Sequence, residues 1–261
     1  MNQPAFASAE GLRLLLLDLA YAGRRAWQSS PEAAASILRL GADHADAATW
    51  LGSAALAREL SEKDLDELTE PWRRLLTVLG RPVELSKAGW LPAEYVAELC
   101  DVLHVHPILA GNANRESNVR PVAAFRKVAM QVGLLHKQHG MLMPTLKGMQ
   151  LRDDAAGLWA HIAGRLPVGR SEISQDAGWF TLLALAGGAD HHAVYDDVHS
   201  LLVDAGWGTT TGRELDRWET PSLVWPTLDV LLGPRRMDLE PSPPWLPPAA
   251  ADVLMRSTSG S

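Results

Sequence analysis

The chain has 261 residues, of which 47% are hydrophobic and 21% charged, and its formal net charge is −7. This length and balance predict a folded globular protein and exclude disorder over most of the chain. A single cysteine, Cys100, excludes an internal disulfide, and its apolar neighbours predict a buried thiol. No apolar run approaches the roughly 20 residues that span a membrane, so we expect a cytoplasmic protein.

The first hundred residues favour helices. Apolar spacing and capping residues predict helices at 9–22, 31–40, 45–60 and 62–79. Ser61 and Asp64 lie at the start of the fourth helix, where side-chain oxygens cap free backbone N–H groups. A short extended segment at 83–85 and a helix at about 92–105 follow.

The second half is also mainly helical. Helices are predicted at 145–163, 178–187, 191–205, 221–232 and 247–255, with a short strand at 237–239. Residues 164–178 are rich in glycine and polar side chains, which indicates a domain boundary. We therefore expect a mainly α fold, a helical bundle with short β-hairpins, divided into regions 1–70, 71–168 and 169–261.

The central stretch 112–152 differs from the rest in charge. It contains seven basic side chains and one acidic side chain, Glu116, so its balance is +6 and the remaining residues sum to −13. A charge asymmetry of this size indicates a surface that meets a partner.

A helix over 120–132 separates this charge from an apolar side. At about 100° per residue, one side carries only apolar residues, namely Val122, Phe125, Val128, Ala129 and Val132. The opposite side carries Arg120, Lys127 and Gln131, with Arg126 at its edge. Gly133 ends the helix, two short strands follow around a turn at 138–140, and Thr145 begins the next helix.

This order resembles the recognition helix and wing of winged-helix domains. The resemblance implies that the helix enters the major groove and that the hairpin contacts the DNA backbone. The order of helix, glycine, strand, turn and helix recurs at 75–99 and 228–254. Duplication of one winged-helix-like unit and independent use of the common glycine and proline caps both explain this recurrence. The candidate nucleic-acid-binding residues are Arg115, Arg120, Arg126, Lys127, Gln131, Lys137, His139 and Lys147.

A second resemblance covers roughly residues 70–255. The segment NRESNVRPVAAFRKVAMQVGLLHKQHGMLMPT, with VELSKAGWLPAEYVAEL before it and LWAHIAGRLP after it, resembles the helical C-terminal region of bacterial plasmid pRi open-reading-frame-three-like proteins. This chain lacks the β-rich N-terminal domain that names that family. The resemblance implies a helical fold and transfers no catalytic residues.

The strongest metal-like pattern lies late in the chain. His192, Asp196 and His199 stand at i, i+4 and i+7 and share one helix face. That face lies opposite the apolar residues of the helix, so a solvated role is favoured over a zinc site. No catalytic or nucleotide-binding motif is present, and we expect neither an enzyme nor a metal or cofactor.

Two functions remain open for this non-enzymatic binding protein. The first is interaction with a protein partner, or self-association, through the winged-helix-like units. The alternative is DNA binding, in the manner of a transcription regulator, by the basic helix and wing at 115–147. The acidic remainder of the chain disfavours tight DNA binding, and no membrane partner is expected.

Overall fold

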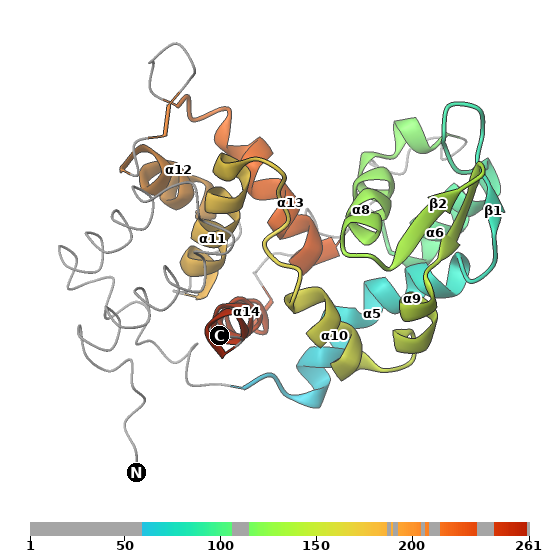
Figure 1. Ribbon diagram of the computed structural model, residues 1–261, viewed down its shortest axis with the longest axis horizontal. Helices are drawn as coiled ribbons and strands as arrows, with labels where there is room; N and C mark the ends of the chain where they lie inside the picture. The colour runs from blue at the N-terminus through green and yellow to red at the C-terminus, as the bar shows by residue number, and fades with distance from the viewer. Residues whose placement is uncertain are drawn as a thin grey trace. The chain divides into compact units, whose positions relative to one another are not determined.

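The computed structural model describes residues 59–105, 115–186, 189, 193–204, 207–208, 215–233 and 243–259 (Figure 1). These residues form helices and one small antiparallel sheet, which confirms the predicted mainly α composition. The helices predicted at 9–22 and 31–40, almost all of 45–60 and the strand at 237–239 lie outside the described residues. No helix within the described ranges is long and apolar enough to cross a membrane.

The chain divides into two compact units. The first, here called the hairpin unit, contains Ser61–Arg165 and Leu228–Pro241, which includes the end of helix α13. The second, here called the α11 unit, contains Leu166–Thr227 and the C-terminal helix. The division after Arg165 lies near the boundary expected at 168, whereas one helix runs continuously through the boundary expected at 70.

That continuous helix is α5 (Glu62–Val78), and its start is defined by a capping box. The Asp64 N–H donates to Ser61 Oγ at 3.2 Å, and the Ser61 N–H donates to Asp64 Oδ2 at 2.9 Å. Pro71 lies inside the helix and is buried, with its ring beside Gly233. Proline has no backbone N–H, so one hydrogen bond of the helix is missing at this residue, and its ring is packed in the core.

The remaining elements of the hairpin unit follow in order. They are β1 (Val83–Glu84), α6 (Ala93–Val102), the short 3-10 helix η2 (Glu116–Asn118), α8 (Arg120–Gln131), β2 (Leu135–Gln138), β3 (Met141–Pro144), α9 (Leu146–Leu151) and α10 (Ala155–Ala163).

The sheet has the strand order β1-β3-β2, with both pairs antiparallel. Lys137 of β2 stands opposite Leu142 of β3, and Val83 of β1 pairs with the same Leu142 from the other side. The hairpin turn consists of His139 and Gly140, with φ angles of 49° and 77°. Two-residue hairpin turns with positive φ at both positions match the twist of the strands that they join.

The core of the hairpin unit forms between the helices and β2. Helix α5 packs on α6 and α10, while α8 packs on α6 and on β2, the strand nearest to it in Figure 1. The rings of Trp72 on α5 and Phe125 on α8 lie 4.5 Å apart between centroids. The apolar side predicted for the helix at 120–132 is confirmed, since all of its members are buried: Val122, Phe125, Val128, Ala129 and Val132. Cys100 is also buried, as predicted.

The predicted helix at 145–163 is in fact two helices, α9 and α10. Thr145 caps α9, because its Oγ1 accepts a hydrogen bond from the Gly148 N–H at 3.0 Å. Asp154 then caps α10 by accepting from the Gly157 N–H at 2.9 Å. A second capping side chain within the apolar pattern starts a new helix, because it satisfies backbone donors that a continuous helix would use.

The α11 unit is built around one buried helix. Its helices are α11 (Glu172–Ala186), α12 (Val194–Asp204), the first part of α13 (Thr220–Leu232) and α14 (Leu246–Ser259). Helix α11 packs against both α12 and α14. It begins six residues before the predicted start at 178, within a segment expected to be irregular. Burial of Asp176 and Ala177 shows that tertiary packing extends this helix into a polar sequence.

Candidate nucleic-acid interface

The exposed face of α8 carries three of the predicted residues in one line. Arg120, Lys127 and Gln131 are all exposed, and spacings of seven and four residues place them along one side of a helix. Ala123 and Ala124 lie between them and are half-buried. Here we call Arg120, Lys127 and Gln131 the α8 stripe. Long polar side chains with small neighbours leave this side of α8 open to a groove or to another surface.

The hairpin places a further cation beside the loop between β1 and α6. Lys137 is exposed in β2, and its Nζ lies 3.2 Å from the position that a Cβ on Gly89 would take. His139 is exposed at the hairpin turn. The two remaining candidates, Arg115 before η2 and Lys147 in α9, are also exposed. Within the described part of the chain, no hydrogen bond or ion pair joins these four residues to the α8 stripe.

Arg126 differs from the other candidates because it points into the protein. Its Nε donates to Glu116 Oε1 at 2.6 Å, and its side chain is 11% exposed while that of Glu116 is 0% exposed. The guanidinium also donates to the Gly89 carbonyl at 3.3 Å, and the Leu91 N–H donates to Glu116 Oε2 at 2.8 Å. This ion pair therefore ties α8 to η2 and to the loop before α6.

Two further residues, His161 of α10 and Arg165 just after it, lie at the C-terminal end of α8 and are not among the candidates predicted from the sequence. His161 Nε2 lies 3.0 Å from the Val132 carbonyl at the end of α8. Arg165 lies beside Gly133, with its Nε 3.8 Å from the position of a Cβ on that glycine. Their only signal in the sequence is a basic character near the end of a predicted helix. That pattern does not indicate that the two side chains lie at the C-terminal end of α8.

The histidine and acid pattern of α12 makes ordinary polar contacts. Asp196 pairs with Arg217 at 2.7 Å, and His199 Nδ1 lies 3.0 Å from Thr220 Oγ1. His192 lies outside the described residues. Within the described ranges, no three histidine, cysteine or acidic side chains are grouped so that they could hold a metal ion.

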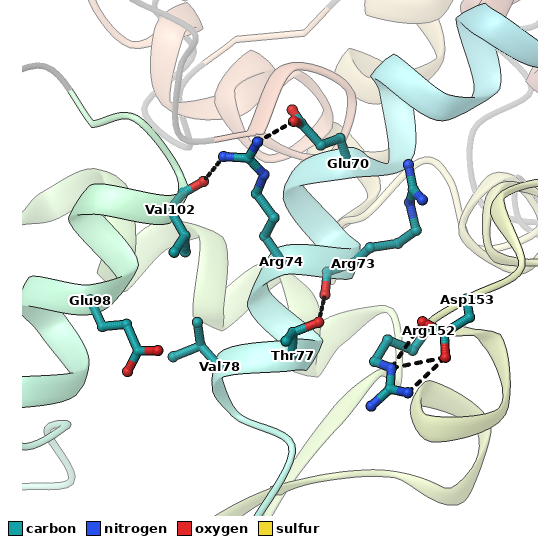
Figure 2. A pocket seen from close by; sticks show the side chains of 9 residues that line it. All are labelled: Glu70, Arg73, Arg74, Thr77, Val78, Glu98, Val102, Arg152 and Asp153. Carbon is teal, nitrogen blue, oxygen red and sulfur yellow. Dashed lines mark hydrogen bonds and ion pairs between the residues drawn. The ribbon is translucent and has the colours of Figure 1, made fainter.

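A cavity of about 380 Å³ lies along α5 (Figure 2). Its arginines are paired with acids: Arg74 with Glu70 at 2.5 Å, Arg73 with Asp66 at 2.9 Å, and Arg152 with Asp153 at 2.7 Å. Figure 2 shows Arg74 reaching both Glu70 and the Val102 carbonyl. Because its cations are neutralised by their own neighbours, this cavity is a weaker anion site than the α8 face. The residues that line it are Glu70, Arg73, Arg74, Thr77, Val78, Glu98, Val102, Arg152 and Asp153.

The α11 unit contains a buried carboxyl group. Asp176 is 2% exposed, and Trp207 Nε1 donates to its Oδ2 at 2.8 Å. Burial raises the pKa of Asp176 to about 6, and nearby Glu172 adds to the increase while the Trp207 hydrogen bond opposes it. The ordinary pKa of an aspartate is about 4, so the folded protein holds this proton more tightly than the unfolded chain does.

This pKa predicts a pH-dependent stability. Because the folded state binds more protons between about pH 4 and pH 6, the stability that the protonated Asp176 contributes is present below that window and lost as pH rises through it. Asp176→Asn should remove this dependence and raise the free energy of unfolding at pH 7.5 by on the order of 2 kcal/mol. Urea denaturation of both proteins at pH 5 and pH 7.5 measures it. An equal difference at both pH values would contradict the assignment.

Charge at the surface of residues 115–150 is one-sided. The exposed charged side chains there are all basic, namely Arg115, Arg120, Lys127, Lys137 and Lys147, while Glu116 is buried against Arg126.

No protein-family model, curated protein or solved structure matches the chain, so its role is inferred from its own residues.

Proposed function

We propose that the hairpin unit is a winged-helix-like domain that binds duplex DNA without catalysing a reaction. The order of elements supports this: helix, strand, helix, helix, strand, strand, with the sheet order β1-β3-β2. In winged-helix domains the helix before the hairpin enters the major groove. In this chain that helix is α8.

The α8 stripe is the observation that carries the proposal. Arginine matches the acceptor edge of guanine, glutamine matches the edge of adenine, and lysine neutralises a phosphate. Arg120, Lys127 and Gln131 supply all three chemistries on one exposed side of α8. Arg126 is excluded from this set because it is paired with Glu116 inside the protein.

The net charge of −7 is compatible with this role. At about 0.15 M salt, exposed charges are screened beyond about 8 Å, so distant acids act weakly on a phosphate bound at α8. The local surface of residues 115–150, on which the exposed charges are basic, therefore decides the interaction with DNA.

Replacing the two cations of the stripe should weaken binding and its salt dependence. Each phosphate contact contributes about 0.9 to the slope of log affinity against log salt concentration. Arg120→Ala combined with Lys127→Ala should lower that slope by 1 to 2 and reduce affinity at 0.1 M salt by at least about tenfold. Fluorescence anisotropy with a labelled duplex of about 20 base pairs, titrated at several salt concentrations, measures both quantities.

Lys63→Ala is the matched control, because Lys63 is exposed on α5 and lies 3.7 Å from Glu67. It should leave both the slope and the affinity unchanged. A wild-type protein that binds no duplex at about 0.05 M salt, where counterion release strongly favours binding, would contradict the proposed function.

A second function, protein association, is favoured by one observation on α9. Leu146 and Met149 are 72% and 57% exposed on the same short helix. Exposed apolar side chains that lie together mark interaction surfaces more often than isolated ones do. A chain that binds no DNA, but whose mass in sedimentation rises with concentration and falls with Met149→Ser, would support this second function instead.

A further inference from the structure

Three basic side chains from α9 and the α10 region gather at the C-terminal end of α8. His161 Nε2 lies 3.0 Å from the Val132 carbonyl, and Arg165 Nη1 donates to the His161 carbonyl at 2.9 Å. The Arg165 guanidinium borders Gly133. Lys147 lies in the first turn of α9, two residues after Thr145, whose Oγ1 donates to the Gly133 carbonyl at 2.8 Å. We call Lys147, His161 and Arg165 the α8-end cluster.

The positive charge of this cluster lies on Lys147 and Arg165. Lys147 and Arg165 are exposed, and no acidic side chain in the described ranges forms an ion pair with either. The pKa of His161 is lowered, first by burial and then by the charge of Arg165, with a smaller effect from Lys147. Asp154 caps the opposite end of α10, so acid and base are separated along that helix.

Capping of α8 does not account for Lys147 and Arg165. Cations near a helix C-terminus are stabilising when they meet its last carbonyls. Here the Met130 carbonyl accepts from the Gly133 N–H, and the Ala129 carbonyl accepts from the Leu134 N–H. His161 contacts the Val132 carbonyl. The two full charges of the cluster therefore remain available to an external anion.

The length of α8 relates the cluster to the proposed function. A 12-residue helix is about 18 Å long, and the major groove of B-DNA is about 12 Å wide. Arg120 stands at the first residue of α8, and the cluster stands beyond its last turn. A helix lying across the groove, with Arg120 directed to the bases, would thus carry the cluster toward one of the two phosphate backbones.

We propose that the α8-end cluster binds the phosphodiester backbone of the duplex that α8 enters, with Arg165 and Lys147 as the contacting residues. This inference rests on the proposed function. It adds Arg165, which lies outside the basic stretch 112–152, and it gives Lys147 a specific role at the phosphate backbone. Duplex DNA is the expected ligand, because the deep, narrow major groove of A-form RNA does not admit a helix.

The test uses the full chain and the same labelled DNA duplex. Arg165→Ala and Lys147→Ala should each lower the salt slope by about 0.9, which is about an eightfold loss of affinity at 0.1 M salt that vanishes toward 1 M. Arg165→Lys should keep the wild-type slope, because the charge remains. Arg152→Ala is the control, since Arg152 is an exposed arginine paired with Asp153, and it should leave the slope unchanged.

The outcomes separate this inference from the proposed function. If Arg120→Ala/Lys127→Ala weakens binding while Arg165→Ala and Lys147→Ala keep the wild-type slope, the cluster does not contact phosphate and the proposed function stands. If the wild type binds no duplex, the proposed function itself fails. If Arg165→Ala lowers Tm because its hydrogen bond to the His161 carbonyl is lost, the salt slope of Lys147→Ala still tests the cluster. Equal competition by duplex RNA of the same sequence would overturn the groove-crossing arrangement.

Discussion

Glu116→Ala is expected to lower the free energy of unfolding by about 3–5 kcal/mol, the largest effect among the substitutions considered. The substitution leaves the Arg126 charge without its partner at a site where the side chain is 11% exposed. It also removes the acceptor of the Leu91 N–H. Burying a charge or a polar group without compensation is costly because the lost hydration is not replaced.

Chemical denaturation followed by circular dichroism measures this loss. Glu98→Ala is the matched control, because Glu98 is exposed on α6, and it should change stability by no more than about 0.5 kcal/mol. Glu116→Leu combined with Arg126→Met should be more stable than Glu116→Leu alone, because an apolar pair leaves no buried charge. If the double variant were the less stable of the two, the ion pair would not be the cause of the loss.

Gly148→Ala is expected to destabilise the hairpin unit by about 3 kcal/mol. A Cβ at this position would lie 2.4 Å from the Leu134 carbonyl oxygen and 3.2 Å from Leu76 Cδ2. Since the first of these atoms belongs to the backbone, α9 must move away from the start of β2. That movement would also strain the Thr145 cap, whose Oγ1 accepts from the Gly148 N–H and donates to the Gly133 carbonyl at 2.8 Å.

Gly164→Ala provides the comparison for this substitution. Gly164 follows α10 with a φ of −68°, and a Cβ there would meet the Ala160 carbonyl at 3.4 Å, close to ordinary contact. In thermal unfolding, the Tm of Gly148→Ala should lie well below that of the wild type. Gly164→Ala should change the free energy of unfolding by no more than about 0.5 kcal/mol. Equal Tm values for the two variants would show that α9 adjusts without cost.

Local patterns predicted the helix α8 and the hairpin that follows it. The spacing of Val122, Phe125 and Ala129 identified the buried side of α8 because helical periodicity is set by the backbone alone. Gly133 was expected to end this helix, and it has a φ of 74°, a conformation that glycine adopts without steric cost. Capping side chains are a less complete guide, because the apolar pattern at 145–163 predicts one helix while Asp154 starts a second one.

The limits of local pattern are clearest where two neighbouring residues have different environments. Lys127 is exposed, whereas Arg126 is directed to a carboxylate ten residues earlier in the chain. Helical phase placed Arg126 at the edge of the polar side, where a small change in direction decides between solvent and an ion pair. The position of η2 beside α8 decides that Arg126 forms the ion pair.

The mainly α composition, the basic stretch at 112–152 and the two sides of α8 follow from residue order and backbone geometry. Which cations reach the surface together depends on tertiary packing. Glu116 withdraws Arg126 from the exposed face, and α10 brings His161 and Arg165 to the end of α8. Such contacts depend on the packing of helices distant in the chain, and helical periodicity carries no information about which helices will pack together.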